Sequence, residues 1–209
     1  MFGRFPAGFC GLSLKIGVLF WGGMPEVAAQ QAKRWTYEEY YRLDDDRRYE
    51  IIDGALLMAP SPTDEHQDWG GDLFLRLAPF VKRNKLGRVF IAFDVILDEE
   101  NTVQPDLIFV STSKLGIIQR RGIFGVPDLL VEIISPSTVR RDRYEKKELY
   151  ARFGVTEYWV VDPANSAVEI LTLQSGAYHL HCSAEEKGVV SSPLLAGFSF
   201  DVSELAKQR

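Results

Sequence analysis

The chain has 209 residues, of which 46% are hydrophobic and 25% charged, and its formal net charge is −5. This length favours one sizeable domain, and the ordinary composition excludes a wholly disordered chain, a collagen or coiled-coil rod and a polytopic membrane protein. The acidic balance argues against a protein that coats nucleic acid, because such binding depends on neutralising phosphates. It leaves room for an enzyme with a local basic face. Two cysteines, Cys10 and Cys182, are too few for a disulfide scaffold or, by themselves, a zinc site.

Residues 1–23 are expected to lie outside the fold, as a loose tail or a start assigned too early, with 24–209 as a single domain. The segment has basic residues and no acid, and it lacks the run of about 18 apolar residues that a membrane span needs. The alternative is a secretory signal with residues 27–29 as its small-residue cleavage site. We expect a cytoplasmic protein without a membrane span.

The first half of the chain predicts two helices and four strands. Thr36 and Glu39 form a capping box, which opens a short helix. Asp53-Gly54 is the turn signal of a hairpin. Apolar residues at helical spacing follow residue 64, and Gly87 is expected to end that helix. In chain order the elements are a helix 36–43, strands 49–52 and 55–58, a helix 64–84, and strands 88–98 and 103–110 with a turn at 98–101.

The second half predicts a buried strand, a helix and then mostly strands. Residues 128–135 are nearly all apolar, which is typical of a strand that is buried on both faces. The other elements are a loop or short helix at 116–127, a helix 138–153 ended by Gly154, strands 157–161, 168–173 and 178–182, and a strand end with a short helix at 198–206. The order indicates an α/β fold: a central mixed β-sheet flanked by helices, with a β-rich C-terminal extension.

Two acids lie on predicted strands that are otherwise apolar. Asp106 opens one of these strands, and Glu132 lies inside the next. A carboxylate in an apolar strand is costly unless it is paired or binds a metal. Strand alternation places Leu130, Glu132 and Ile134 on one face. A salt bridge or a capping acid is the alternative interpretation, and spacing alone weighs the two equally.

The predicted helix 138–153 carries a third component. Asp142, Lys146 and Tyr150 are spaced i, i+4 and i+8, so they fall within an arc of about 80° on one helix face. That face presents an acid, an ammonium and a phenol. The alternative is a surface Asp–Lys ion pair, worth about a few tenths of a kcal/mol.

Six motifs in order resemble those of the Uma-type restriction endonucleases in the PD-(D/E)xK nuclease superfamily. Each motif is weak alone, whereas six in order with compatible spacing are specific, and they extend over about residues 35–205. The motifs are 49–54 (YEIIDG), His66-Gln67, 103–107 (VQPDL), 131–137 (VEIISPS), Asp142…Lys146 with 149–152 (LYAR), and 154–163 (GVTEYWVVDP).

The resemblance implies a restriction-endonuclease-like core and metal-assisted hydrolysis of phosphodiester bonds in DNA. Asp106 and Glu132 would hold Mg²⁺ or Mn²⁺, and the carbonyl of Ile133 would complete the shell. A metal-bound water would attack, and Lys146 would orient or help deprotonate it and stabilise the developing charge. The superfamily pattern places its lysine two residues after the second acid, where this chain has Ile134. In the Uma-type family the lysine lies on the following helix.

Glu50 and His66 are supporting candidates with open alternatives. Glu50 would make a further, water-mediated metal contact, or else pair with Arg47 or Arg48. His66, at a helix start, would contact phosphate, or else be a satisfied histidine near the site.

Asp142 and Tyr150 are the other supporting candidates, both beside Lys146, and Tyr150 is expected to pack over the lysine or hydrogen-bond near it. The remaining polar and aromatic residues are interpreted as structural or surface positions, namely Asp94, Tyr158, Trp159, His179 and His181.

DNA is the expected partner, and a homodimer is a second expectation because cutting both strands takes two sites. The candidate phosphate contacts are the basic face of helix 138–153 and Lys82, Arg83, Lys85 and Arg88. No known reading module is recognisable, so sequence specificity is not inferred. One alternative is a non-catalytic nucleic-acid- or protein-binding module on a nuclease scaffold. Another is a metal-dependent hydrolase with a non-nucleic substrate, which the acidic charge keeps open.

Overall fold

The structure is a computed structural model that describes residues 33–45 and 47–205. The predictions for residues 1–23, for the site at 27–29 and for Cys10 lie outside the described residues. Among the helices of the described ranges, none has the length and apolar character that crossing a membrane would require.

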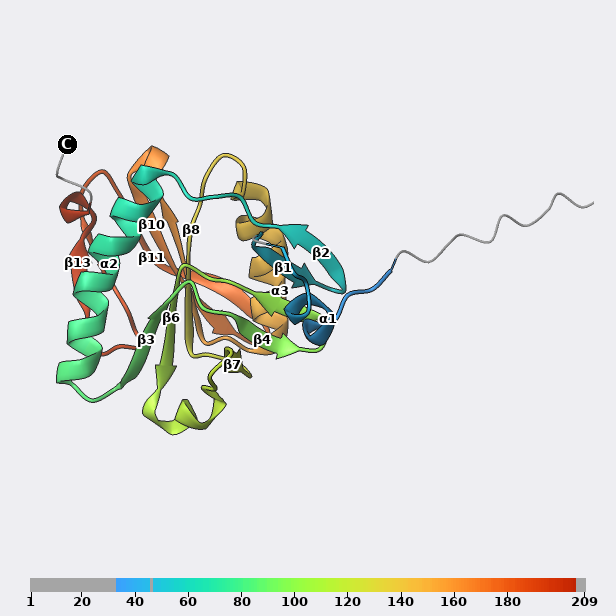
Figure 1. Ribbon diagram of the computed structural model, residues 1–209. Helices are drawn as coiled ribbons and strands as arrows, with labels where there is room; N and C mark the ends of the chain where they lie inside the picture. The colour runs from blue at the N-terminus through green and yellow to red at the C-terminus, as the bar shows by residue number, and fades with distance from the viewer. Residues whose placement is uncertain (1–32, 46, 206–209) are drawn as a thin grey trace, which may run out of the picture. The chain divides into compact units, whose positions relative to one another are not determined.

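A six-stranded mixed sheet forms the centre of the fold (Figure 1). Its strands are β3 (Gly87–Ile91), β6 (Leu107–Ser111), β8 (Leu129–Ile133), β9 (Glu157–Asp162), β10 (Ala167–Gln174) and β11 (Ala177–Glu185). The spatial order is β11-β10-β9-β8-β6-β3. Within this sheet β8 and β9 run parallel, and the helical crossover between them supplies the chain length that a parallel pair needs. The predicted central mixed sheet is therefore confirmed.

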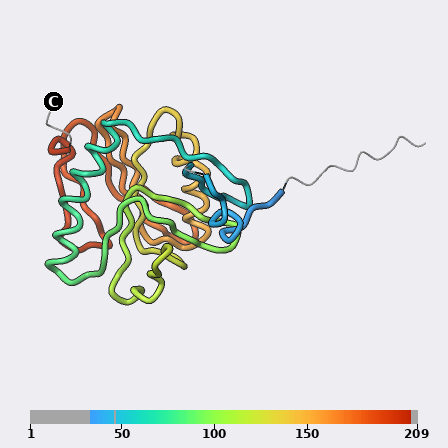
Figure 2. Tube along the Cα trace, in the orientation of Figure 1, coloured from blue at the N-terminus to red at the C-terminus, as the bar shows by residue number. Residues whose placement is uncertain are grey.

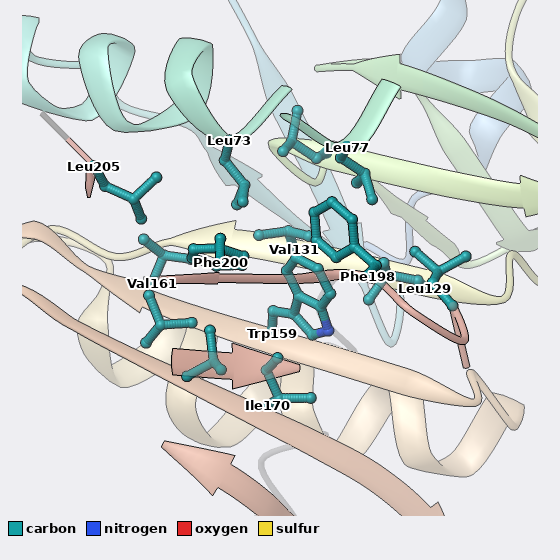
Figure 3. Packing of buried hydrophobic residues seen from close by; sticks show 14 of the residues in the cluster. Leu73, Leu77, Leu129, Val131, Trp159, Val161, Ile170, Phe198, Phe200 and Leu205 are labelled. Atoms are coloured by element: carbon teal, nitrogen blue, oxygen red, sulfur yellow. The ribbon is translucent and has the colours of Figure 1, made fainter. Parts of the chain in front are cut away.

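Helix α2 (Asp64–Arg83) covers one face of this sheet. Its buried positions recur at helical spacing, as predicted, and include Leu73 and Leu77. They pack with the inward side chains of β8 and β9, such as Val131 and Trp159. Phe198 from the C-terminal segment stacks on Trp159 with ring centroids 5.9 Å apart, and it closes this core (Figure 3).

A second, five-stranded sheet lies against the other face of the central sheet, in the order β2-β1-β5-β4-β7. Its strands are β1 (Tyr49–Ile52), β2 (Ala55–Met58), β4 (Val95–Asp98), β5 (Asn101–Val103) and β7 (Ile123–Phe124). The predicted hairpin is confirmed, with Asp53 at φ 49° and Gly54 at φ 77° in its turn. Helix α1 (Tyr37–Tyr41) precedes it and has the predicted capping box.

The C-terminal part is rich in strands, as predicted. The hairpin of β10 and β11 is followed by a two-stranded sheet of β12 (Val189–Ser191) and β13 (Ser199–Asp201). Short 3₁₀ helices complete the fold, namely η1 (Thr112–Ile117), η3 (Pro163–Asn165) and η4 (Val202–Glu204).

Two predicted long strands are each divided between the two sheets, which is a correction to the predictions for 88–98 and 103–110. The chain leaves the central sheet after β3, where Ala92 adopts a left-handed conformation with φ 44°. It returns at β6 after Pro105, which has no N–H for a ladder. Ala92 N donates to the Asp106 carbonyl at 3.1 Å and ties the two crossing points together. The path can be followed in Figure 2.

Gly87 does not end α2, contrary to the prediction. The helix ends at Arg83, Asn84 caps it, and Lys85 turns the chain at φ 55°. Gly87 instead begins β3 at φ 156°, where an added Cβ would lie 2.0 Å from the carbonyl oxygen of Val110. The close approach of β6 to β3 at this position therefore leaves no room for a side chain.

The predicted helix 138–153 is not uniform. Residues Arg141–Lys146 (η2) form a π-helical segment, followed by α3 (Lys147–Phe153). Gly154 ends the helix at φ 84°, as predicted. π-Helical turns inside α-helices are rare, and those that occur often lie at functional sites.

Candidate active site

Asp106 and Glu132 come from neighbouring strands of the central sheet. The antiparallel register pairs Leu107 with Val131, so continuing it by one residue places Asp106 opposite Glu132. The backbone N–H of Ile133 donates to Asp106 Oδ2 at 2.7 Å, which fixes that carboxylate at the strand end. The two acids that stood out in the sequence are therefore brought together.

Lys146 projects from η2 into a shell of three carboxylates. Its Nζ lies 2.7 Å from Glu50 Oε1, 3.0 Å from Glu132 Oε1 and 3.4 Å from Asp142 Oδ1. Only 5% of its side chain is exposed. The predicted shared face of Asp142, Lys146 and Tyr150 exists and is buried, which excludes the surface-pair alternative.

Glu50 reaches the cluster from β1 of the second sheet. It contacts Lys146 and, at 3.5 Å, Arg141 Nη1, rather than Arg47 or Arg48. Glu50 therefore pairs with Lys146, and not with either arginine of the alternative interpretation.

Gln104 is a site residue that the sequence reasoning missed. Its backbone N–H donates to Glu50 Oε1 at 3.0 Å, and its side chain contacts Tyr40, Asp94 and Arg48. It therefore connects α1, β1 and the segment before β4 directly beside Asp106. The one available signal was its place two residues before that acid. Asp94 serves this network, consistent with a structural role.

Tyr150 lies under the buried acid. Its hydroxyl donates to Glu132 Oε1 at 2.6 Å, and its ring meets Tyr158 edge to face with centroids 5.3 Å apart. Tyr158 OH in turn donates to the Asp142 carbonyl at 2.9 Å. Tyr158 and Trp159 are fully buried, as predicted for core residues.

His66 lies in the first turn of α2, and its Nε2 is 3.2 Å from Asp106 Oδ1. Burial alone would lower the pKa of His66, but the hydrogen bond and charge of Asp106 outweigh it and raise the pKa. His66 is thus both partnered and at the site, and a phosphate contact remains a proposal.

The carboxyl groups of the site, with Lys146 and His66, line one pocket of about 350 Å³. Its acidic floor is formed by the carboxyl groups of Glu50, Asp106, Glu132 and Asp142, with Lys146 among them. The rest of the pocket lining includes His66, Gly70, Gly71, Gln104, Ile133, Ser135, Ser137, Thr138 and Arg141.

The acidic floor has more carboxyl groups than cations. Among the described residues, Lys146 and Arg141 are the permanent cations within 4 Å of its four carboxyl groups. Burial raises the pKa of Glu132 well above its usual value, against the opposing charge of Lys146. Burial likewise raises the pKa of Asp142.

Lys146 is held in its charged form. Burial alone would lower its pKa, but the surrounding carboxylates outweigh burial and raise the pKa well above its usual value. The ammonium is therefore a fixed positive charge.

The donor set fits a hard divalent cation. Asp106 and Glu132 offer carboxylate oxygens to the pocket, which Ile133 also lines. Oε2 of Glu132 has no hydrogen-bond partner among the described residues, since Lys146 and Tyr150 both contact Oε1. The described residues hold no cluster of three or more His, Cys, Asp or Glu side chains arranged as a ready metal cage. Two carboxylates suit Mg²⁺, which keeps several waters.

Several predicted residues lie outside this pocket. His179 and His181 are exposed on β11, as expected. Lys82 is 16 residues beyond His66 on α2, which is about 24 Å along the helix. The predicted phosphate contacts at this end, Lys82, Arg83, Lys85 and Arg88, are therefore remote from the acidic floor.

Comparison with known proteins places the chain. A family model, Uma2, described as "Putative restriction endonuclease", matches residues 37–203. A comparison with curated proteins found no match. A crystal structure described as "a putative nuclease" from Anabaena variabilis is similar in fold, with a TM-score of 0.67 and 18% identity over 81% of this chain and 96% of that one. The family match covers most of the chain, and the chain belongs to the Uma2 family.

Proposed function

We propose that this protein is a metal-dependent endonuclease that hydrolyses phosphodiester bonds in DNA. The observation that carries the proposal is the convergence of Asp106, Glu132 and Lys146, from two strands and a helix, on one open pocket. Membership of the family supports nuclease activity.

Asp106 and Glu132, with the Ile133 carbonyl, would hold Mg²⁺ or Mn²⁺. When bound, such an ion supplies Lewis acidity and lowers the pKa of a coordinated water. Asp106 is preset for ligation by its hydrogen bonds to Ile133 and His66.

Lys146 would act by charge and position. As a protonated ammonium it has no lone pair to accept a proton, so it orients the attacking water and stabilises the negative charge that develops on the phosphate. Glu50 and Asp142 hold the ammonium in place, and Tyr150 holds Glu132. The lysine would therefore orient the attacking water rather than deprotonate it.

The experiment is a nicking assay on supercoiled plasmid with Mg²⁺ or Mn²⁺. We expect the wild type to cut, and Asp106→Asn and Glu132→Gln to lose at least about 100-fold in rate, a typical cost of removing one electrostatic catalytic group. Glu148→Gln, at an exposed position of α3, is the matched control and should retain activity.

Circular dichroism should show all variants folded. Cutting that survives both substitutions would contradict the proposed site. DNA that is bound in the presence of metal and never cut would favour a non-catalytic binding module, and metal-dependent hydrolysis of non-nucleic substrates alone would favour the other alternative.

A further inference from the structure

A second polar surface lines the pocket, and it is unlike the acidic floor. Ser135, Ser137 and Thr138 follow β8 directly. Ser135 Oγ lies 2.9 Å from Ser137 Oγ and 3.1 Å from Thr138 Oγ1. Ser137 is exposed, whereas the floor carboxyl of Glu132 is buried. We call these three residues and Arg141 the hydroxyl rim.

The local backbone fixes the rim in place. Ile134 N donates to the Val161 carbonyl and ends the strand ladder, and Pro136 cannot continue it. Ser135 N then donates to Thr138 Oγ1 at 3.0 Å, while Thr138 N donates back to the Ser135 carbonyl. Hydroxyl hydrogens rotate to suit their partners, so the Ser135 and Ser137 hydroxyls can turn donors toward a ligand, while the Thr138 hydroxyl hydrogen-bonds Asp142.

Arg141 adds positive charge beside the hydroxyls. Its only ion pair among the described residues is the 3.5 Å contact of Nη1 with Glu50 Oε2, and its side chain is 23% exposed. A guanidinium has five N–H donors, most of which this single contact leaves free. Arginine is well suited to phosphate, because its planar fork can donate two parallel hydrogen bonds.

The chemistry of the pocket separates two binding tasks. The acidic floor repels a phosphate unless a cation lies between them, so it cannot by itself hold an anionic polymer. Neutral and positive donors at the mouth are suited to anionic oxygens, and contacts to backbone phosphates position a polynucleotide without reading its sequence.

We propose that the hydroxyl rim binds a DNA backbone phosphate adjacent to the one that is cut. This inference rests on the proposed nuclease function for its choice of DNA as the ligand. The rim sets the position of the strand, and the acidic floor performs the hydrolysis.

The test measures binding of a fluorescein-labelled 12-base-pair duplex by anisotropy in Ca²⁺. Ser137→Ala should raise the Kd about tenfold, as expected for losing a hydrogen bond to a charged group. Arg141→Gln should make the fall of log K for DNA binding with log salt concentration shallower by about 1, because the variant neutralises one phosphate fewer.

The matched control is Ser113→Ala. Ser113 Oγ lies 2.9 Å from Ser111 Oγ, so it reproduces the hydroxyl pair, but at the far end of β6. That end is about 17 Å from Asp106 along the strand. Its Kd should equal that of the wild type, and thermal melting should show every variant folded.

The outcomes separate this inference from the proposed function. If rim variants weaken binding while the wild type never cuts DNA, the rim stands and the nuclease proposal fails. Suppose instead that the wild type cuts DNA, while the rim variants keep its Kd, its KM for cutting and its salt dependence. The rim then does not bind DNA phosphate, and the nuclease proposal stands. A wild type that neither binds nor cuts DNA overturns both.

Discussion

Lys146 is the residue on which the site depends for its geometry. Its ammonium touches carboxylates from β1, β8 and η2 and therefore fixes the distance between the two sheets and the helix. Removing one partner from a buried ionic cluster leaves uncompensated charge, which is more costly than never burying the cluster.

Lys146→Met should lower the free energy of unfolding by about 3–5 kcal/mol, because three carboxylates would lose their shared cation. Lys147→Met is the control at a half-buried position next to it, and we expect a change within about 0.5 kcal/mol. Urea denaturation measures both. Equal effects of the two substitutions would show that the cluster contributes nothing specific to stability.

The sequence singled out Asp106, Glu132 and Lys146 and placed Asp142 and Tyr150 beside the lysine, but it did not predict that Glu50 contacts Lys146. Asp106 and Glu132 stood out because charge in an apolar strand needs a reason, and Lys146 because of its helix face. The partnership of Glu50 with the lysine could not be predicted, because it depends on how a second sheet stacks on the first. Gln104 was missed because a polar residue before a proline looks like an ordinary turn. Its contacts with Tyr40 and Asp94 also depend on how the second sheet packs.

Glu157 is a buried carboxyl that lies outside the acidic floor. It lies on β9, where it accepts hydrogen bonds from Trp159 Nε1 at 2.6 Å and Leu194 N at 3.0 Å. It thereby attaches the C-terminal segment to the central sheet. Burial raises its pKa, against the opposing hydrogen bonds from Ser192, Trp159 and Leu194.

The raised pKa of Glu157 predicts a pH dependence of stability. Between the ordinary value of 4.5 and the higher folded value, the unfolded chain has lost this proton while the folded chain retains it. Stability from this group therefore falls as pH rises through that window. Urea denaturation across pH should show this decline in the wild type and a smaller decline in Glu157→Gln. Parallel curves for the two proteins would exclude the assignment.

At the scale of elements, α2 carries two adjacent glycines on the pocket wall. An added Cβ at Gly71 meets no atom within 4 Å, whereas at Gly70 it would lie 3.1 Å from Ile133 Cδ1. Glycine inside a helix is less stable than alanine. Packing therefore does not require Gly71, although the residue does line the pocket.

Gly71→Ala should raise the free energy of unfolding by about 0.5–1 kcal/mol, through helix propensity alone. Gly70→Ala should raise it less, because buried Ile133 would have to shift. Thermal or urea denaturation of both variants measures the difference. A destabilised Gly71→Ala would show a packing constraint that the structure does not contain.

Element prediction succeeded where the signal was local. The capping box at Thr36, the hairpin turn at Asp53 and the αL cap at Gly154 all depend on short-range chemistry. The prediction of strand 88–98 failed because apolar residues continue from Val89 to Phe93, so only tertiary packing decides which sheet each half joins. In 103–110, by contrast, Gln104-Pro105-Asp106 interrupts the apolar residues at the crossing point. The π-helical turn of η2 left no signal, because helical spacing is similar in both forms.

For the whole molecule, the two sheets define the site. The central sheet supplies Asp106 and Glu132, the second sheet supplies Glu50, and the helix after β8 adds Lys146. The mixed α/β class was predictable from the order of elements. The second sheet was not, because β4 and the end of β5 lie in predicted strands that continue into the central sheet.

Calorimetric titration of Mn²⁺ into the metal-free protein shows directly whether the site holds a divalent ion. We expect one ion bound per chain in the wild type. We also expect that Asp106→Asn abolishes this binding, while Glu148→Gln retains it. Absence of binding in the wild type, or equal binding by Asp106→Asn, would contradict a divalent ion held at the junction of β6 and β8.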